Sequence, residues 1–295
     1  MELTHTATRP GRLSSFLKQE MAMSTGLVNR LKWKNRILVN GRPEHNDFAV
    51  SVGDVITALL DDPMPDYPAE QGDLTVLYED AHLLAVDKPA GMLIHPSRSK
   101  NTGTLANLVA GYYERTGQSC AFHPMTRLDR DTFGIVLLAK NAHVHALLNA
   151  LHDAGKMEKR YHALVFGRPG AETGIIDAPI ARKPLPSLLR EISPEGKPSV
   201  TEYALLQRFD RFSKLELRPI TGRTHQLRLH CLHMGFPILG DPQYATHASA
   251  ALSQNLGLTA QLLCAHSLKL PHPVTEELMT LISSMEITGE AYASY

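Results

Sequence analysis

The chain has 295 residues, with 30 Lys and Arg balanced by 30 Asp and Glu. This length is sufficient for one large domain with a smaller companion. Because the formal net charge at pH 7 is zero, the chain as a whole provides no basic field for a polyanion. A nucleic-acid partner would therefore have to bind a local basic patch.

The cysteine content and the lack of long apolar segments indicate a cytoplasmic protein. Cys120, Cys231 and Cys264 are odd in number and form no CxxC pair, which argues against a disulfide framework and favours a reducing compartment. No segment reaches the length of a membrane span, and the N-terminus has neither the apolar core nor the cleavage site of a secretory signal. We therefore expect no membrane interaction.

The first 60 residues predict a small module made of a helix and a hairpin. Apolar residues recur at helical spacing from 13 to 31, and Asn40-Gly41 is a strong signal for a tight hairpin turn. Alternating residues at 48–50 and an apolar run at 55–60 predict further strands.

A short basic run follows the predicted helix of this module. Lys32, Lys34 and Arg36 have no acidic residue between them. Such a run suits contacts with phosphates. A solvated surface of a small module explains it as well.

Residues 61–72 predict a linker, because three prolines stand among acidic residues there and proline cannot donate to a hydrogen-bond ladder. Beyond it, strands are predicted at 74–77, 83–86, 161–166, 201–206 and 214–217, and helices at 104–113 and 142–154. These elements do not alternate regularly, which favours an α+β fold over a doubly wound sheet. The polar segment 182–198 is predicted to be a mobile loop.

The motif with the clearest chemical content lies before the apolar run 135–139. Asp129 stands between Arg127 and Arg130 at a turn. Cationic neighbours favour an ionised carboxylate, which suits a nucleophile. A solvated charged loop that enters a strand explains this short motif equally well, so the rest of the chain must decide between the two interpretations.

Several short blocks of the chain share the order and spacing of one known family. They are 86–92 with 95–96, 127–134, 159–161 with 165–167, 196–198 with 201–203, 221–230 running on to 240–241, and 263–268 with 272–273. Through these blocks, and over nearly its whole length, the chain resembles a pseudouridine synthase of the RluA type with an N-terminal S4-like RNA-binding module. This resemblance implies an α+β fold, with the S4-like module at 1–60, the linker at 61–72 and, at 73–295, a catalytic domain built on a mixed, largely antiparallel sheet.

The resemblance implies an enzyme that isomerises specific uridines to pseudouridine in structured RNA. Ribosomal RNA is the first candidate substrate and tRNA the second. The N1–C1′ bond breaks, the base rotates while it is held, and C5 bonds to C1′, so neither a cofactor nor a metal is needed. We expect the protein to act as a monomer.

The resemblance also assigns the catalytic residues. Asp129 would be the essential carboxylate at C1′, either as nucleophile or as a stabilising charge, as carboxylates are in glycosidases. Arg228 would pair with it, and Tyr161 would stack on the target base and could transfer a proton. Arg127 would fill the space of the flipped base. Taken alone, Tyr161 fits packing in a strand and Arg228 fits a surface cation.

RNA contacts are assigned to two groups of residues. In the catalytic domain they are Arg223, His225 and Gln226, and in the N-terminal module they are Lys32, Lys34 and Arg36. The turn at 88–91 is expected to shape the pocket without acting in catalysis.

A metal site is not expected at the histidines that follow Thr224. The spacing of His225, His230, Cys231 and His233 fits no common zinc pattern. If this segment is a strand, Thr224, Gln226 and Arg228 face one side and His225 the other. A metal-dependent hydrolase is therefore disfavoured, whereas a non-catalytic RNA-binding or ribosome-associated factor is the main alternative to the enzyme. Asp129 and Arg228 argue against that alternative.

Two residues depart from the family pattern. Thr126 stands where most members have histidine, and Phe133 stands where most have serine. Neither replaces the aspartate, the arginines or the tyrosine. The departures bear on which uridine is chosen, which depends on RNA shape and on loop conformations.

Overall fold

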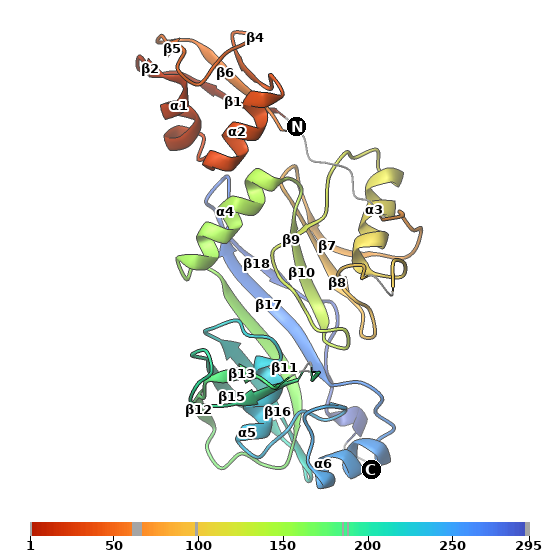
Figure 1. Ribbon diagram of the computed structural model, residues 1–295. Helices are drawn as coiled ribbons and strands as arrows, with labels where there is room; N and C mark the ends of the chain where they lie inside the picture. The colour runs from red at the N-terminus through yellow and green to blue at the C-terminus, as the bar shows by residue number, and fades with distance from the viewer. Residues whose placement is uncertain (1, 61–66, 98–99, 185, 188, 293–295) are drawn as a thin grey trace.

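The computed structural model describes residues 2–60, 67–97, 100–184, 186–187 and 189–292. The first six strands and two helices form a small unit at one end of the molecule, and α5 and α6 lie at the other end (Figure 1). The elements of the N-terminal unit are β1 (Glu2–Thr6), β2 (Gly11–Arg12), α1 (Leu13–Ser15), a π-helical turn (Phe16–Glu20), α2 (Thr25–Trp33), β3 (Ile37–Val39), β4 (Arg42–Pro43), β5 (Ala49–Val50) and β6 (Val55–Leu59).

The N-terminal unit has a sheet and a hydrophobic core of its own. Its strands pair antiparallel in the order β1-β6-β3-β4, and β2 pairs with β5 beside them. Phe16, Leu31 and Ile56 are fully buried in this core. The predicted hairpin turn is confirmed, because Asn40 and Gly41 both adopt positive φ between β3 and β4, as a type I′ turn requires.

The predicted helix at 13–31 is wrong in its continuity. The chain forms two helical pieces there, separated by residues 21–24, and Ala22 has a positive φ of 49°. Ser24 then starts α2, since its Oγ accepts the Leu27 amide at 3.2 Å. A side-chain cap of this kind satisfies an amide that a new helix leaves unpaired. The apolar residues therefore keep their helical spacing across the break at 21–24, so this spacing alone could not show where the first helical piece ends.

The predicted linker can be compared only in its second half, because 61–66 lie outside the described residues. From Pro68 onward the chain is bound to the larger body. Asn107 donates from Nδ2 to the Pro68 carbonyl at 2.8 Å, and the Glu70 amide donates to the Asn107 carbonyl at 2.9 Å. A Cβ on Gly111 would lie 2.0 Å from the Glu70 carbonyl oxygen, so this close approach requires glycine.

The larger body is built on a ten-stranded sheet. Its elements are β7 (Thr75–Glu79), β8 (Leu83–Lys88), α3 (Leu105–Arg115), β9 (His123–Pro124), β10 (Phe133–Ala139), α4 (Ala142–Asp153), β11 (Glu158–Phe166), β12 (Thr173–Asp177), β13 (Ile180–Arg182), β14 (Arg190–Ile192), β15 (Val200–Arg208), β16 (Phe212–Pro219), α5 (Gln226–His233), α6 (His247–Asn255), β17 (Leu263–Pro271), β18 (Leu278–Ile282) and a 3-10 turn (Glu290–Tyr292).

The sheet order is β12-β15-β16-β11-β17-β10-β8-β7, with β18 added beside β17 and β9 beside β10. Among the strands of the described chain, β10 and β17 pair in parallel and the other neighbours are antiparallel. The predicted α+β fold on a mixed, largely antiparallel sheet is therefore confirmed.

Helices α3 and α4 cover opposite faces of the sheet at β8 and β10. Leu83 and Leu137 pack in the cluster of α4, whereas Leu84 and Val136 pack in the cluster of α3. Since successive strand residues point to opposite faces, strands that are buried on both sides are apolar throughout. This explains the uninterrupted apolar run at 135–139.

The segment 182–198, predicted to be a mobile loop, is irregular for most of its described length but contains Arg182, the end of β13, and the whole of β14. Strands β13 and β14 form an antiparallel pair there, with Ile180 opposite Ile192. Ile180 packs against Leu229 and Tyr244, and Ile192 lies on the same cluster. Burial against neighbouring elements, which the local composition does not record, stabilises this strand pair.

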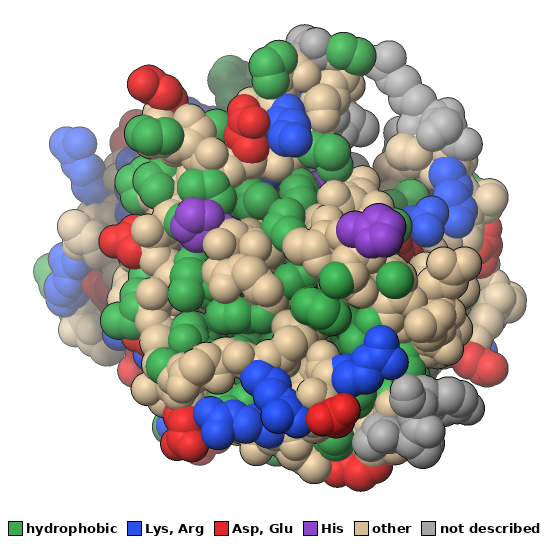
Figure 2. Space-filling model, turned by 90° about the horizontal axis from the view of Figure 1, so that it is seen from below, with side chains coloured by type: hydrophobic (Ala, Val, Ile, Leu, Met, Phe, Trp, Pro, Cys, Tyr) green, Lys and Arg blue, Asp and Glu red, His purple; other side chains and the backbone are tan. Residues whose placement is uncertain are grey.

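The end of the molecule with α5 and α6 is seen in Figure 2. Hydrophobic and uncharged atoms fill the centre of this face, and the Lys and Arg side chains stand toward its edges. In the part of the chain that the structure describes, no helix combines the length and apolar character that a bilayer crossing requires.

Candidate active site

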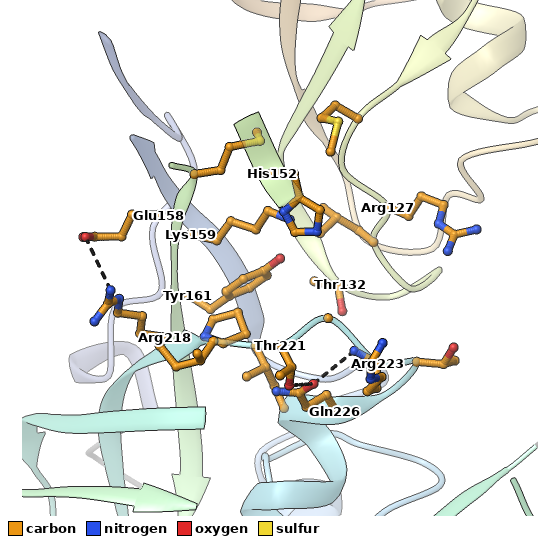
Figure 3. Close-up of a pocket in the computed structure, with 18 of the residues that line it drawn as sticks. Arg127, Thr132, His152, Glu158, Lys159, Tyr161, Arg218, Thr221, Arg223 and Gln226 are labelled. Atoms are coloured by element: carbon orange, nitrogen blue, oxygen red, sulfur yellow. Dashed lines mark hydrogen bonds and ion pairs between the residues drawn. The ribbon is translucent and has the colours of Figure 1, made fainter. Parts of the chain in front are cut away.

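A cavity of about 730 Å³ opens where β11, the end of β16, the loop before β10 and the start of α5 meet. It brings together seven of the residues chosen from the sequence, namely Arg127, Asp129, Tyr161, Arg223, His225, Gln226 and Arg228. Figure 3 shows the Tyr161 ring projecting from β11 into this space, with Lys159 and Arg218 on neighbouring parts of the wall. Lys32, Lys34 and Arg36 lie in the N-terminal unit, outside the described lining.

Asp129 is paired with Arg228, which lies 99 residues further along the chain. The Arg228 Nη1 donates to Asp129 Oδ2 at 2.9 Å. The flanking Arg130 instead pairs with Asp131 at 3.0 Å. The interpretation that Arg127 and Arg130 orient Asp129 is therefore wrong for Arg130. The predicted pairing of Asp129 with Arg228 is confirmed by the structure.

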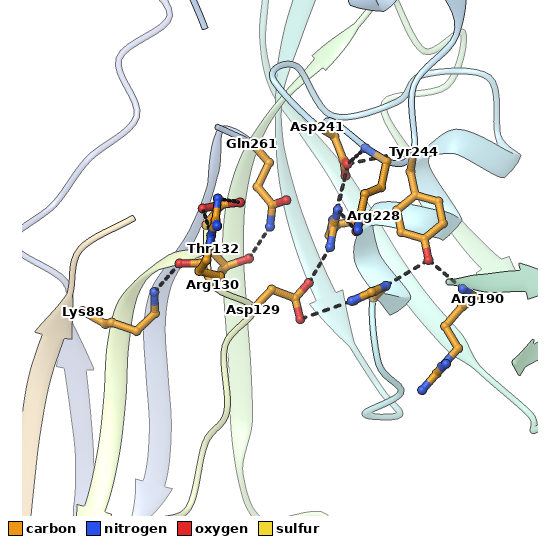
Figure 4. Close-up of polar contacts among 12 residues, drawn as sticks. Lys88, Asp129, Arg130, Thr132, Arg190, Arg228, Asp241, Tyr244 and Gln261 are labelled. Carbon is orange, nitrogen blue, oxygen red and sulfur yellow. Dashed lines mark hydrogen bonds and ion pairs between the residues drawn. The ribbon is translucent and has the colours of Figure 1, made fainter. Parts of the chain in front are cut away.

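Arg228 is itself held by Asp241, a residue that sequence reasoning did not select. Nε and Nη2 of Arg228 donate to the two carboxylate oxygens of Asp241 at 2.7 and 2.8 Å, and Nη2 also donates to Gln243 at 2.9 Å. The Asp241 side chain is fully buried and the Arg228 side chain is only 5% exposed. A bidentate carboxylate fixes the plane of the guanidinium, so Nη1 is aimed at Asp129 (Figure 4).

The charges of this network are balanced by hydrogen bonds. Burial alone would raise the pKa of Asp241, but the hydrogen bonds and charge of Arg228 and the amides of Gln243 and Tyr244 bring that pKa below its usual value. Burial alone would lower the pKa of Arg228, but Asp241 and Asp129 raise it. The network therefore stays ionised. The Gly240-Asp241 block was the signal that could have identified Asp241.

His225 lies on the other side of the Asp129 carboxylate. Its Nε2 is 4.0 Å from Asp129 Oδ1, and its Nδ1 is 2.9 Å from the Tyr244 hydroxyl. That hydroxyl accepts the Arg190 amide at 2.8 Å, which leaves its own hydrogen for Nδ1 and puts the imidazole hydrogen on Nε2. Burial lowers the pKa of His225 despite the nearby Asp129 charge, so His225 is neutral at neutral pH.

Tyr161 enters the cavity at an irregularity of the sheet. The pairing of β11 with β17 shifts between Arg160, opposite Ser267, and Tyr161, opposite Ala265. Such a bulge re-aims neighbouring side chains. Burial, and secondarily the Asp129 charge, raises the pKa of Tyr161 to about 12, so the phenol keeps its proton at neutral pH.

The loop that carries Asp129 is anchored by the buried Lys88. Its Nζ donates to the carbonyls of Pro89 at 2.8 Å, Met92 at 2.9 Å and Arg130 at 2.9 Å. Burial lowers the pKa of Lys88 to about 8, against the opposing charges of Asp131 and Asp129. The turn at 88–91 was expected only to shape the pocket, and its lysine also ties the aspartate loop to the end of β8.

Two further contacts fix this loop on its other side. Gln261 Nε2 donates to the Thr132 hydroxyl at 2.7 Å. At Gly134, where φ is 101°, a Cβ would lie 2.4 Å from the Ala265 carbonyl oxygen. Only glycine permits so close an approach of β10 to β17.

Of the two departures from the family pattern, neither is turned into the cavity. Thr126 is buried and its hydroxyl accepts the Leu137 amide at 3.0 Å. Phe133 packs against the cluster that contains Leu164, Leu239 and Cys264. Both residues therefore pack within the protein next to the aspartate loop, outside the described lining of the cavity.

Gln226 holds the rim of the cavity together. Its Oε1 accepts from Thr221 Oγ1 at 2.9 Å and from the Arg223 amide at 3.0 Å. Its Nε2 donates to the Val200 carbonyl and to Thr201 Oγ1, both at 3.0 Å. Each polar group of this amide is thus engaged within the protein, and an RNA contact by Gln226 stays a prediction. Arg223 is exposed beside it.

The premise that 224–230 is a strand is wrong. Residues Gln226–His233 form α5, which begins after His225 in the left-handed region at a φ of 59°. Leu227 and Cys231, four residues apart, pack in one cluster. The buried residues therefore follow the spacing of a helix and not the alternation of a strand. His230 is buried and bonds to Thr201 Oγ1 at 2.9 Å and to the Ala178 carbonyl at 3.0 Å.

The fold and the arrangement of side chains in the cavity together indicate the class of protein. Asp129 lies in the loop before β10, where the buried Arg228 orients its carboxylate, and the protonated Tyr161 enters the same cavity from β11, on the far side of β17 from β10. The fold is also that of the human RNA pseudouridylate synthase domain containing 1, with a TM-score of 0.62 and 23% sequence identity over 76% of this chain and 88% of that one.

The RNA pseudouridylate synthase family model matches residues 82–233, and the chain belongs to this family. It is 40% identical over 266 residues to an RNA pseudouridine synthase of Chloroflexus aurantiacus, covering 89% of this chain and 82% of the relative. It is 32% identical over 265 residues to the ribosomal large subunit pseudouridine synthase D of Pasteurella multocida, covering 85% and 81%. The chain is accordingly an RNA pseudouridine synthase, and the alternative of a non-catalytic factor is set aside.

Proposed function

We propose that this enzyme converts uridines of large-subunit ribosomal RNA to pseudouridine, with Asp129 as the carboxylate that acts at C1′. Relatives named ribosomal large subunit pseudouridine synthases C and D support the choice of RNA. The observation that carries the role of Asp129 is its carboxylate, presented to the cavity by Arg228, which Asp241 in turn holds from behind.

The two oxygens of Asp129 have different surroundings. Oδ2 accepts Arg228 at 2.9 Å, whereas Oδ1 has His225 only at 4.0 Å. Oδ1 is therefore the oxygen that can approach C1′, as a nucleophile or as a charge beside an oxocarbenium-like centre. The Arg228 cation lies between two carboxylates, which leaves a net negative charge where positive charge develops at the sugar.

The remaining residues of the cavity suit the movement of the base. When the N1–C1′ bond breaks, its electrons leave with the uracil, which turns and bonds through C5, loses the C5 proton and regains one at N1. The ring of Tyr161 can stack on the uracil, and its protonated phenol is a hydrogen-bond donor. Arg127 is exposed at the mouth of the cavity, where its planar cation would replace the flipped base in the RNA stack. Arg223 and His225 would contact the same nucleotide region.

We further propose that 1–60 is an S4-like RNA-binding module, joined by 61–72 to a catalytic domain at 73–295. Its separate sheet and core support this division. Lys32, Lys34 and Arg36 would bind phosphates. We also propose a monomeric, cytoplasmic enzyme that works without a cofactor.

The test is a pseudouridine map of total RNA from cells with and without the gene, complemented by the wild-type protein or by Asp129→Asn. We expect one or more large-subunit rRNA sites to vanish with the gene, to return with the wild type, and to stay absent with the amide. Asp131→Asn, the same change two residues away, is the control and should restore the sites. Identical maps with and without the gene contradict the proposal.

A further inference from the structure

Trp33 is the single tryptophan of the chain and the most exposed of the large hydrophobic side chains that the structure describes, at 84%. Tryptophan is on average among the more buried residues of folded proteins. None of the residues that line the catalytic cavity comes from its helix. The exposed ring therefore serves neither the described core nor the described cavity.

Helix geometry keeps this ring away from the core. Leu27, Val28 and Leu31 form the buried side of α2. Trp33 ends the helix two residues after Leu31, which is about 200° around the helix axis. The next residue, Lys34, caps the helix with its amide on the carbonyls of Leu31 and Lys32. The ring is thus presented from a fixed end of the unit rather than from a free tail.

The immediate neighbours of Trp33 are polar or cationic. The Lys32 ammonium lies 6.0 Å from the centroid of the indole ring, at the limit of a cation–π contact. Lys34 and Asn35 are exposed, and Arg36 is half-buried. A protein partner would need a contiguous apolar patch, whereas an aromatic ring among cations is the arrangement by which proteins bind single-stranded nucleic acid.

We propose that Trp33 stacks on an unpaired base of the RNA substrate while the adjacent cations contact its phosphates. The inference rests on the proposed function, because it assigns part of the RNA contact to the N-terminal unit. Stacking on an indole tolerates any base, since every base offers a π-face. Trp33 therefore adds affinity for looped or single-stranded RNA without selecting a sequence.

The first measurement uses the fluorescence of the sole tryptophan in the full-length protein. A uridine dodecamer should quench it on binding. A blunt RNA duplex with the same number of phosphates should quench it less, since its bases are already stacked on one another. Trp33→Phe keeps an aromatic ring and Trp33→Leu keeps only the apolar volume, so anisotropy of a labelled dodecamer separates stacking from burial.

Removal of one base stack by alanine substitution corresponds to about 1–3 kcal/mol, so we expect Trp33→Leu to weaken binding about 5- to 150-fold. Trp33→Phe should bind nearly as tightly as the wild type. The salt dependence should be the same for all three proteins, because the cations that face the phosphates are unchanged. Val52→Ala is the control, since Val52 is 65% exposed in the same unit, and it should leave binding unchanged.

Unaltered fluorescence at saturating dodecamer overturns the proposal, and so does equal dodecamer binding by Trp33→Leu and Trp33→Phe. Either outcome is expected if the surface around Trp33 binds a protein instead of RNA. Conversion of transcribed large-subunit rRNA is measured in parallel with the wild type. Conversion without quenching overturns only the stacking. Quenching without conversion of this RNA overturns the proposed rRNA activity and leaves the stacking in place.

Discussion

The paired charges of Arg228 and Asp241 at the cavity are buried, whereas the cations at the end of α2 in the N-terminal unit are partly or fully exposed. In the cavity, Arg228 is 5% exposed and Asp241 is fully buried, and each polar atom of the pair has a defined partner. In the N-terminal unit, Lys34 and Trp33 face solvent at the end of α2. Buried charges hold their geometry but tolerate no loss of a partner, whereas exposed charges are replaceable and are screened by salt.

Under the proposed function, this difference separates the two tasks of the enzyme. Chemistry at C1′ would need Asp129 fixed to within a fraction of an ångström, and its pairing with Arg228 would supply that. Affinity for a polyanion needs only positive charge and a stacking surface within reach. Changes in the cavity should therefore act in large steps on conversion, and changes in the N-terminal unit should act gradually on binding.

The largest effect is expected where the buried network is broken. Asp241→Asn removes the bidentate acceptor of Arg228 and leaves the guanidinium with Asp129 as its remaining carboxylate. Breaking a buried pair on one side typically costs about 3–5 kcal/mol. We expect a loss of unfolding free energy of that order in urea, and a fall in conversion of at least about 100-fold because Arg228 no longer holds Asp129 in place.

The exposed pair of Arg168 and Asp210, 3.0 Å apart with Asp210 at 92% exposure, supplies the control. Asp210→Asn should cost well under about 1 kcal/mol and leave conversion unchanged. If Asp241→Asn behaves like Asp210→Asn in both assays, the cavity does not depend on its buried network and the comparison fails.

From the sequence, the candidate catalytic residues could be predicted better than the contacts that hold them in place. Asp129, Arg228 and Tyr161 lie in short blocks with a recognisable order, and the structure brings all three to one cavity. The pairing of Asp241 with Arg228 could not be predicted in the same way, because an aspartate in the sequence is the same whether its carboxylate faces solvent or a buried arginine. Lys88 looked like part of a turn for the same reason.

The incorrect secondary-structure predictions have a common cause. Leu227 and Leu229 alternate like strand residues, yet α5 buries them in different clusters. The polar segment around Ile192 became a strand because that residue meets a hydrophobic cluster behind it. In both cases the deciding contacts come from elements distant in the chain, which override local propensity.

A second, smaller effect should appear in the acid stability of the larger body. The rings of His162 and His266 stack with centroids 3.8 Å apart, and His162 Nε2 is 4.0 Å from Glu216. Burial first, and then His266 and Lys214, lower the pKa of His162 to about 4 against the opposing Glu286 charge. A lowered folded pKa means that the unfolded chain binds the proton more tightly between about pH 6.5 and 4.

Stability should therefore fall as the pH is lowered through that window, by up to about 2–3 kcal/mol from this group. Urea unfolding of the wild type at pH 7 and 4.5 should show the loss, and His162→Gln should reduce it. His247→Gln, at the exposed start of α6, should not. An equal acid loss in His162→Gln would locate the sensitivity in other groups of the body.

The smallest effect per residue is expected for the basic run of the N-terminal unit. Changing Lys32, Lys34 and Arg36 together to glutamine should weaken binding to any RNA and flatten the dependence of log K on log salt by about 0.7–0.9 for each phosphate that is no longer neutralised. Arg115, Arg168 and Arg208 are exposed cations outside the described lining of the cavity, and their triple glutamine change is the charge-matched control. An equal slope in the two triple variants would mean that the run acts only through net charge. A flatter slope with unaltered conversion at saturating RNA would place affinity in the N-terminal unit and chemistry in the cavity.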